Sequence, residues 1–195
     1  MKYKDEALVM QSMNAAMETI RKDKALSALL DRIAASGELY SHSVNVAKAS
    51  AQLAVSAGMN EGERNDLCLA GLLHDAGKLV TPERILYKPG PLDPDELEIM
   101  RRHPLDGYDM CPTLRARPRE IIRDHHEKNG GTGYPRGLKI VSPYCSVITV
   151  ADIFSALSEP RSYHRAQTAL EAMTSIIAFD GLDRDLITLL PSVMS

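Results

Sequence analysis

The chain has 195 residues, of which 44% are hydrophobic and 5% aromatic, and its net charge is −3 at pH 7. This length favours one domain, or one domain with a short appendage. The charge provides no broad basic surface of the kind that binds duplex nucleic acid. The N-terminus lacks the apolar stretch of a signal peptide, and no apolar run approaches the roughly 20 residues of a membrane span. We therefore expect a soluble, cytoplasmic protein.

Three widely spaced cysteines without a CxxC pair favour reduced, buried thiols: Cys68, Cys111 and Cys145.

Apolar residues recur with helical spacing along the chain, and this pattern predicts an all-α fold. Residues 5–35 are expected to form one helix. Its apolar stripe is either part of the core or a dimerisation surface; it contains Met10, Met13, Met17 and Ile20. Further helices are expected over residues 38–57, 63–76, 93–103, 118–128, 142–158, 162–177 and 182–190.

Capping residues and helix breakers support these boundaries. Asp93 can cap a helix with Pro94 in its first turn, and Glu96 completes a capping box. Two segments rich in proline or glycine are expected to be irregular, residues 80–92 and 129–137.

Histidines beside acids are the chemically informative feature. His74 and Asp75 end an otherwise apolar helix, where burying an imidazole and a carboxylate is costly unless a partner satisfies them. His125 and His126 are flanked by acids, and Asp152 interrupts an apolar helix. Imidazole and carboxylate together suit divalent first-row metals, so these residues are candidate metal ligands.

Single members of this set have ordinary alternatives. A lone His–Asp pair is often a surface ion pair, and His103 before Pro104 would suit the negative end of a helix dipole. Lys78 lies one turn after His74 if that helix continues past Gly77. Such a lysine either holds a phosphate oxygen or complements the helix dipole.

Four motifs in order resemble the HD-GYP domain family, a subfamily of the HD phosphohydrolases. They are His74-Asp75-Ala76-Gly77-Lys78, His103-Pro104-x-x-Gly107, His125-His126-Glu127-Lys128 and Gly133-Tyr134-Pro135. The resemblance covers about residues 38–190. It implies an HD-GYP phosphohydrolase domain over residues 37–195, preceded by an N-terminal helical segment, residues 1–36. Known members of the family are chiefly bacterial cyclic-di-GMP phosphodiesterases, and some prefer other cyclic dinucleotides.

The resemblance also implies a metal-ligand set. Glu38, one helical turn before His42, stands where a subset of the family has a glutamate that supports a third metal; its alternative is an acid favoured by the dipole in a helix's first turn. The implied cofactors are two divalent ions, or three with Glu38, with Fe or Mn favoured over Ni or Zn. The implied ligands are His42, His74, Asp75, His103, His125, His126 and Asp152.

Three positions depart from the family's pattern. Gly130 and Ser155 stand where the family usually has aspartate, and His164 replaces an arginine. His164 lies in the segment that binds ligand phosphates in the family, which retains Arg161 and Arg165 here. These changes leave the implied metal ligands intact and bear on the grip on phosphate.

The leading hypothesis is a phosphodiesterase that hydrolyses cyclic di-GMP. Asp75 would bridge two metals and Lys78 would neutralise phosphate charge, while Arg161 and Arg165 would hold the second phosphate. The resemblance assigns the loop around Tyr134 to the substrate pocket and to contacts with signalling proteins; its alternative is a tight turn. The competing hypotheses are an HD-type phosphohydrolase for another nucleotide such as 3′,3′-cyclic GMP-AMP, and a module that binds metal or ligand and signals without turnover.

Overall fold

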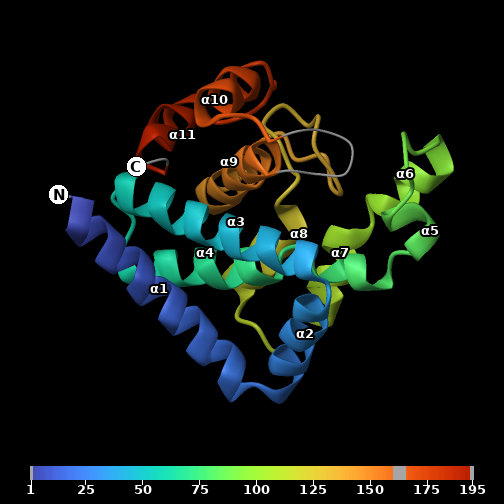
Figure 1. Ribbon diagram of the computed structural model, residues 1–195, viewed down its shortest axis with the longest axis horizontal. Coiled ribbons are helices and arrows are strands. Elements are labelled where there is room, and N and C mark those ends of the chain that lie inside the picture. The colour runs from blue at the N-terminus through green and yellow to red at the C-terminus, as the bar shows by residue number, and fades with distance from the viewer. Residues whose placement is uncertain (1, 160–165, 194–195) are drawn as a thin grey trace.

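The computed structural model describes residues 2–159 and 166–193. Within these ranges the chain forms α-helices and short 3₁₀ helices and no strand, which confirms the predicted all-α fold (Figure 1). The elements are α1 (Lys2–Lys22), α2 (Lys24–Ala35), α3 (Gly37–Ser56), α4 (Glu61–Leu73), η1 (Ala76–Val80), α5 (Glu83–Leu86), α6 (Pro94–Met100), α7 (His103–Met110), α8 (Ala116–Asp124), α9 (Pro143–Ser158), α10 (Ala169–Ile177), α11 (Arg184–Leu189) and η2 (Leu190–Ser192).

The expected single helix over residues 5–35 is wrong, because Asp23 divides it. The Asp23 backbone is extended, and its carboxylate accepts hydrogen bonds from the N–H groups of Ala25 and Leu26. This cap starts α2 and turns it away from α1. The stripe on α1 is only partly core: Ile20 is buried, whereas Met10 is 54% exposed.

Two boundaries beside the candidate ligands also differ from expectation. The helix expected over residues 63–76 ends at Leu73, with His74 as its C-cap, so Lys78 lies in η1 and not on a continued α-helix. The helix expected to end at His103 ends at Met100. His103 instead begins α7, where Pro104 suits the first turn because its missing N–H has no partner to lose there.

The later boundaries shift as well. The helix expected over residues 118–128 spans Ala116–Asp124, and α10 begins at Ala169, after residues 166–168, which are not helical. Thr168 and Glu171 form a capping box that sets this start. The predicted capping box at Asp93 and Glu96 is confirmed.

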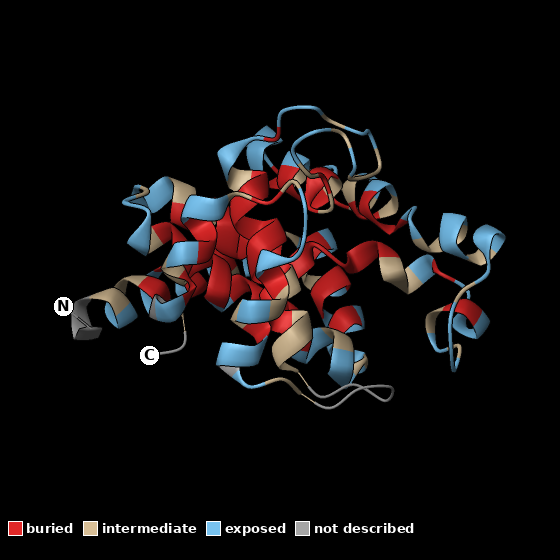
Figure 2. Cartoon of the chain, turned by 90° about the horizontal axis from the view of Figure 1, so that it is seen from above, coloured by how far each residue is buried: buried red, intermediate tan, exposed pale blue. Residues whose placement is uncertain are grey.

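The core of the bundle is aliphatic, and buried side chains of α3, α4, α8 and α9 belong to one cluster. Figure 2 shows the buried residues concentrated in the middle of the chain. Helices α3 and α4 run side by side in Figure 1. Gly71 on α4 allows this approach, since a Cβ there would lie 2.7 Å from the Cα of Ala47 on α3. Helices α5 and α6 project from the bundle and are mostly exposed.

The N-terminal helices share this core. Side chains from α1 and α2, including Ala16, Ile20, Leu26 and Ile33, are buried in the same cluster as those of α3, α4 and α9. The boundary expected near residue 36 stays a prediction, and so does the dimerisation surface that was the alternative for the α1 stripe.

Two expectations from composition can be compared with the described residues. All three cysteines are buried and free, as predicted. Among the described helices, none combines the length and the apolarity that crossing a membrane requires.

The close contact between α3 and α4 gives a test of this packing. Gly71→Ala should lower the free energy of unfolding by about 1–3 kcal/mol, because the added methyl group overlaps the α3 backbone. Gly62→Ala, on the exposed first turn of the same helix, should change it by less than about 1 kcal/mol or stabilise the helix slightly. Urea unfolding of both variants measures the difference, and equal values for the two would contradict the proposed packing.

Candidate metal centre

The predicted ligands come from five separate elements and meet inside the bundle. His42 lies in α3 and Asp152 in α9, whereas His74, His103 and His125 lie at the ends of α4, α7 and α8. Most of these side chains are buried, His74 and His125 completely. Their ligand atoms form three overlapping groups within 4.8 Å: His103, His125 and His126; His42, His74 and Asp152; His74, Asp75 and His125.

Hydrogen bonds to the main chain fix three of the imidazoles. Nδ1 of His74 lies 2.8 Å from the carbonyl oxygen of Gly71. Nδ1 of His103 lies 2.8 Å from that of Met100, and Nδ1 of His125 lies 2.7 Å from that of Ile122. A carbonyl oxygen can only accept, so each Nδ1 carries the proton. In its neutral form, each ring then presents the lone pair of Nε2, which is the form that binds metals.

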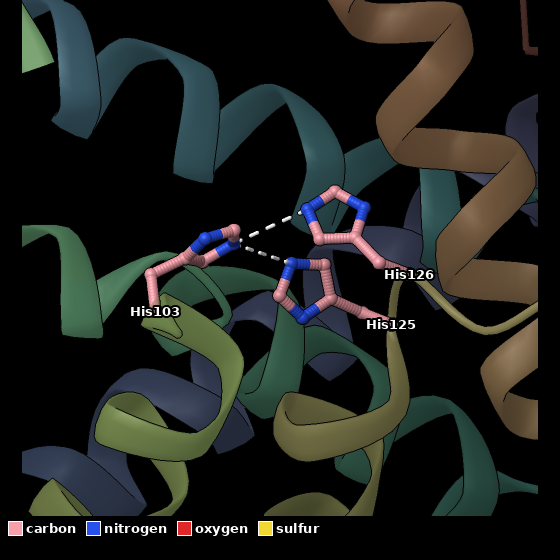
Figure 3. A group of neighbouring side chains, drawn as sticks. All are labelled: His103, His125 and His126. Carbon is pink, nitrogen blue, oxygen red and sulfur yellow. Dashed lines mark hydrogen bonds between the residues drawn. The ribbon is translucent and has the colours of Figure 1, made fainter. Parts of the chain in front are cut away.

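Figure 3 shows the rings of His103, His125 and His126 pointing toward one another. Nε2 of His103 lies 3.2 Å from Nε2 of His125 and 3.2 Å from Nε2 of His126. With their protons on Nδ1, neutral His103 and His125 have no proton on Nε2 and cannot hydrogen-bond to each other there. Two nitrogens bound at about 2.1 Å to one ion would lie about 3–3.4 Å apart, so this spacing fits a shared divalent cation.

Buried atoms without hydrogen-bond partners lie beside these nitrogens. Nε2 of His74 and Oδ1 of Asp75 are both buried and make no hydrogen bond in the described structure. Oδ1 of Asp75 lies 3.2 Å from Nε2 of His103, while its Oδ2 lies 3.4 Å from Nε2 of His74. Leaving such groups unsatisfied costs about 1–3 kcal/mol each, and a cation would satisfy both. The residues therefore fit a metal.

The two aspartates bring negative charge into this buried region. Burial opposes ionisation of Asp75, but the charge of Lys78 and its histidine neighbours hold its pKa well below the usual range. The Lys78 ammonium lies 2.5 Å from Oδ2 of Asp75. Burial likewise opposes ionisation of Asp152, but the hydrogen bond with His42 and nearby imidazoles hold its pKa well below the usual range. Both groups are carboxylates at neutral pH.

His42 is held differently from the other rings. Its Nε2 lies 3.0 Å from Oδ1 of Asp152, and its Nδ1 lies 2.9 Å from Oε2 of Glu159. Burial would lower the pKa of His42, but hydrogen bonds to these two carboxylates raise it to about 9.

The loop after His126 is fixed by two buried carboxylates. Glu127 accepts hydrogen bonds from the backbone N–H groups of Arg136, Gly137 and Leu138. Asp124 pairs with the guanidinium groups of Arg123 and Arg136. Residues 129–137 are irregular, as predicted, yet firmly attached to the end of α8.

This attachment places Tyr134 over the histidines. Its ring stacks on His126 with 4.6 Å between centroids and an interplanar angle of 28°. The guanidinium carbon of Arg101 lies 5.3 Å from the centre of the same ring, a cation–π distance. Arg101 is exposed. An aromatic face and a positive charge therefore lie next to the candidate ligands.

Some predicted residues are not part of this cluster. Glu38 is exposed and belongs to none of the three metal-compatible groups among the described residues. Arg161, Arg165 and the departure at His164 lie outside the described residues. Ser155 is buried in α9.

The sequence reasoning missed two neighbours of the cluster. Glu159 stands 117 positions from His42, and no local pattern links the two. Arg101 precedes the predicted ligand His103 by two positions, and that proximity to the ligand was the available signal.

Comparison with known proteins gives one consistent result. The HD domain family matches residues 21–186. A cyclic di-GMP phosphodiesterase of Pseudomonas aeruginosa is 35% identical over 83% of this chain and 40% of its own. A 3′3′-cGAMP-specific phosphodiesterase of Vibrio cholerae is 37% identical over 69% of this chain and 32% of its own. The solved HDG"Y"P protein Bd1817 of Bdellovibrio bacteriovorus aligns over 99% of this chain and 72% of its own, with a TM-score of 0.66 and 20% identity.

Metal binding should be visible as added stability. Mn²⁺ at about 100 times its dissociation constant should stabilise the metal-stripped protein by about 2.7 kcal/mol, which corresponds to about 5–10 °C in Tm. His103→Ala should lose most of this rise because it removes a nitrogen from the three-histidine group. Differential scanning calorimetry with and without chelator measures both values. The same rise in both proteins would contradict a site at His103.

Proposed function

The chain belongs to the HD domain family, and we propose that it is a metal-dependent phosphodiesterase that hydrolyses a cyclic dinucleotide, most directly cyclic di-GMP. The convergence of histidine Nε2 atoms beside two buried carboxylates carries this proposal. The chain spans about two fifths of the length of the Pseudomonas relative. Activity, substrate and partners are therefore proposals for this chain.

Two divalent ions, with Fe or Mn favoured over Ni or Zn, account for the overlapping ligand groups. Such a pair, when bound, lowers the pKa of water and neutralises charge on a phosphodiester. Asp75 belongs to one group directly and lies 3.2 Å from His103 of another, which supports a bridging role. The proposed ligands are His42, His74, Asp75, His103, His125, His126 and Asp152. The third ion expected at Glu38 stays a prediction.

Lys78 is proposed to stabilise the negative charge that develops on the phosphate. Its ammonium lies beside Asp75 and its side chain is 21% exposed, so it stands at the boundary between the cluster and solvent. An ammonium there can donate to a phosphate oxygen while Asp75 holds it in place.

Tyr134 and Arg101 are proposed to bind the substrate outside the ligands. Bases stack on aromatic rings, and guanidinium groups pair with phosphates. The neighbouring ring and guanidinium offer both kinds of contact beside His126. Arg161 and Arg165 stay predicted contacts to the second phosphate.

A closely related substrate is the alternative. The Vibrio cholerae relative is named for 3′3′-cGAMP and is as similar to this chain as the cyclic di-GMP enzyme is. 3′,3′-Cyclic GMP-AMP shares the phosphodiester ring of cyclic di-GMP and differs in one base. The metal cluster would serve either, and the base contacts decide between them.

The loop that carries Tyr134 is also proposed to contact a signalling protein. Ile140, near its end, is 85% exposed, and a partner surface on this loop would bury that aliphatic side chain.

Hydrolysis tests the proposed activity. The Mn²⁺- or Fe²⁺-loaded protein should hydrolyse cyclic di-GMP, and Asp75→Ala should lose at least about 100-fold in kcat/KM because it removes a proposed ligand. Lys78→Ala should lose about 10²-fold or more in kcat, the usual effect of one electrostatic donor. Product formation is followed by chromatography, with 3′,3′-cyclic GMP-AMP in parallel. Wild-type turnover no faster than that of Asp75→Ala would refute the proposal, and binding without product would identify a non-hydrolysing module.

The substrate contact at Arg101 has a matched control in its neighbour. Arg101→Ala should raise KM for the cyclic dinucleotide about 10-fold, the equivalent of one charge-assisted contact, with a smaller change in kcat. Arg102→Ala removes a neighbouring arginine that is also exposed and whose guanidinium instead lies 3.4 Å from Asp106. It should leave KM unchanged. Equal effects of the two substitutions would show a general charge effect and exclude a specific contact.

A further inference from the structure

The histidines of the metal centre differ in what fixes Nδ1. In His74, His103 and His125, Nδ1 donates to a carbonyl oxygen three residues earlier in the chain. His42 has no such bond. It lies in the interior of α3, where main-chain carbonyls already accept the hydrogen bonds of the helix. Its Nδ1 instead lies 2.9 Å from Oε2 of Glu159, the C-cap residue of α9.

Glu159 is itself held in place from α3. Its other oxygen, Oε1, accepts a hydrogen bond of 2.8 Å from the side-chain amide of Asn45. Asn45 stands one turn after His42, so both contacts come from the same face of α3. The Glu159 side chain is 19% exposed and that of His42 is 6% exposed, so the contact between them is largely shielded from water.

A carboxylate in this position does what the carbonyl oxygens do for the other rings. It accepts only, so the Nδ1–H of His42 stays on the side of Glu159. Nε2 faces Asp152 and Asp75, and a bound metal would replace the proton that Nε2 directs at Asp152 in the metal-free ring. A charged acceptor also makes the imidazole a stronger electron donor at Nε2 than a carbonyl does. The ring is turned toward the same group of ligands that includes His74 and Asp152.

We propose that Glu159 is the positioning residue of His42: it fixes the ring's tautomer and orientation and thereby strengthens divalent-metal binding by the group of His42, His74 and Asp152. This proposal rests on the proposed metal centre. Removing such an outer partner of a ligating histidine lowers metal affinity by about 10–100-fold. A purely structural strap between α3 and α9 would instead affect stability and leave affinity unchanged.

Metal titration of the metal-stripped protein separates these roles. Glu159→Ala should weaken Mn²⁺ binding by about 10–100-fold, as measured by calorimetry and by competition with a chromogenic chelator. Glu159→Gln should weaken it less, because the amide oxygen still accepts from Nδ1 without the charge. The same variants are unfolded with urea in chelator, so that the change in affinity is compared with the change in stability.

A matched control is Glu63→Ala. Glu63 also joins two helices through its side chain, accepting a hydrogen bond of 2.9 Å from the hydroxyl of Tyr144. It lies in the first turn of α4, at the opposite end from His74. Its removal should cost stability without changing Mn²⁺ affinity.

A second readout follows the histidine itself. In ¹⁵N-histidine NMR spectra, the Nδ1–H proton of His42 should be protected and shifted downfield in the wild type, and should lose both properties in Glu159→Ala. Glu63→Ala should keep the wild-type signal.

Three results would overturn the proposal. One is wild-type Mn²⁺ affinity in folded Glu159→Ala. Another is an equal loss of affinity in Glu63→Ala, which would make the effect one of global stability. If Glu159→Ala fails to fold, Glu159→Gln replaces it in the test. Wild-type Mn²⁺ affinity in that variant, together with a His42 Nδ1–H signal unchanged from the wild type, has the same consequence. Absence of Mn²⁺ binding in the wild type would refute the proposed metal centre as well, whereas normal wild-type binding with unaffected variants would refute the role of Glu159 alone.

Discussion

Three hydrogen bonds from imidazole Nδ1–H groups to main-chain carbonyl oxygens determine what the centre of this bundle can bind. The acceptors belong to Gly71, Met100 and Ile122, each in the last turn of its helix. Carbonyl oxygens of a last turn lack partners within the helix. The histidines therefore satisfy helix ends with one nitrogen and direct the other inward. This explains why these three members of the cluster stand at helix termini. It also explains why one residue can serve both the helix end and the cluster, two roles that looked like alternatives for His103 in the sequence.

Once Nε2 is deprotonated on these rings, the interior holds lone pairs and two carboxylates with little to balance them. Lys78 offsets part of the charge at Asp75, and the pKa of His42 rises to about 9 between Asp152 and Glu159. Burying unpaired charge is costly. A cation bound among these lone pairs and carboxylates would therefore stabilise the folded protein. The close α3–α4 contact at Gly71 matters for the same reason, because it holds His42 and His74 at a ring-centroid distance of 5.3 Å.

Local sequence determined much of the fold and of the candidate site. Caps with strong side-chain signals, such as the box at Asp93 and Glu96, gave correct boundaries. The boundary at Asp23 was not predicted, because nothing in the apolar periodicity marks where two helices with the same stripe change direction. The grouping of the candidate ligands could be predicted because ordered motifs carry information about tertiary structure that single residues lack. Glu159 was missed because its role depends on a contact between elements far apart in the chain, and Glu38 is exposed because a shared helical face with His42 does not ensure a shared environment.

The candidate metal centre and the loop after it are joined by hydrogen bonds and stacking, so one cannot move without the other. His126 belongs to the three-histidine group, and the next residue, Glu127, holds the loop backbone through three N–H groups. Tyr134 returns from that loop to stack on His126, and its backbone N–H donates to the His126 carbonyl oxygen. A protein that displaced this loop would have to break the bonds to Glu127 or move His126 with it. Contact at the exposed Ile140 would then alter the surface proposed to receive substrate together with a candidate ligand. The proposed partner binding and the proposed catalysis would therefore be coupled through a few adjacent residues.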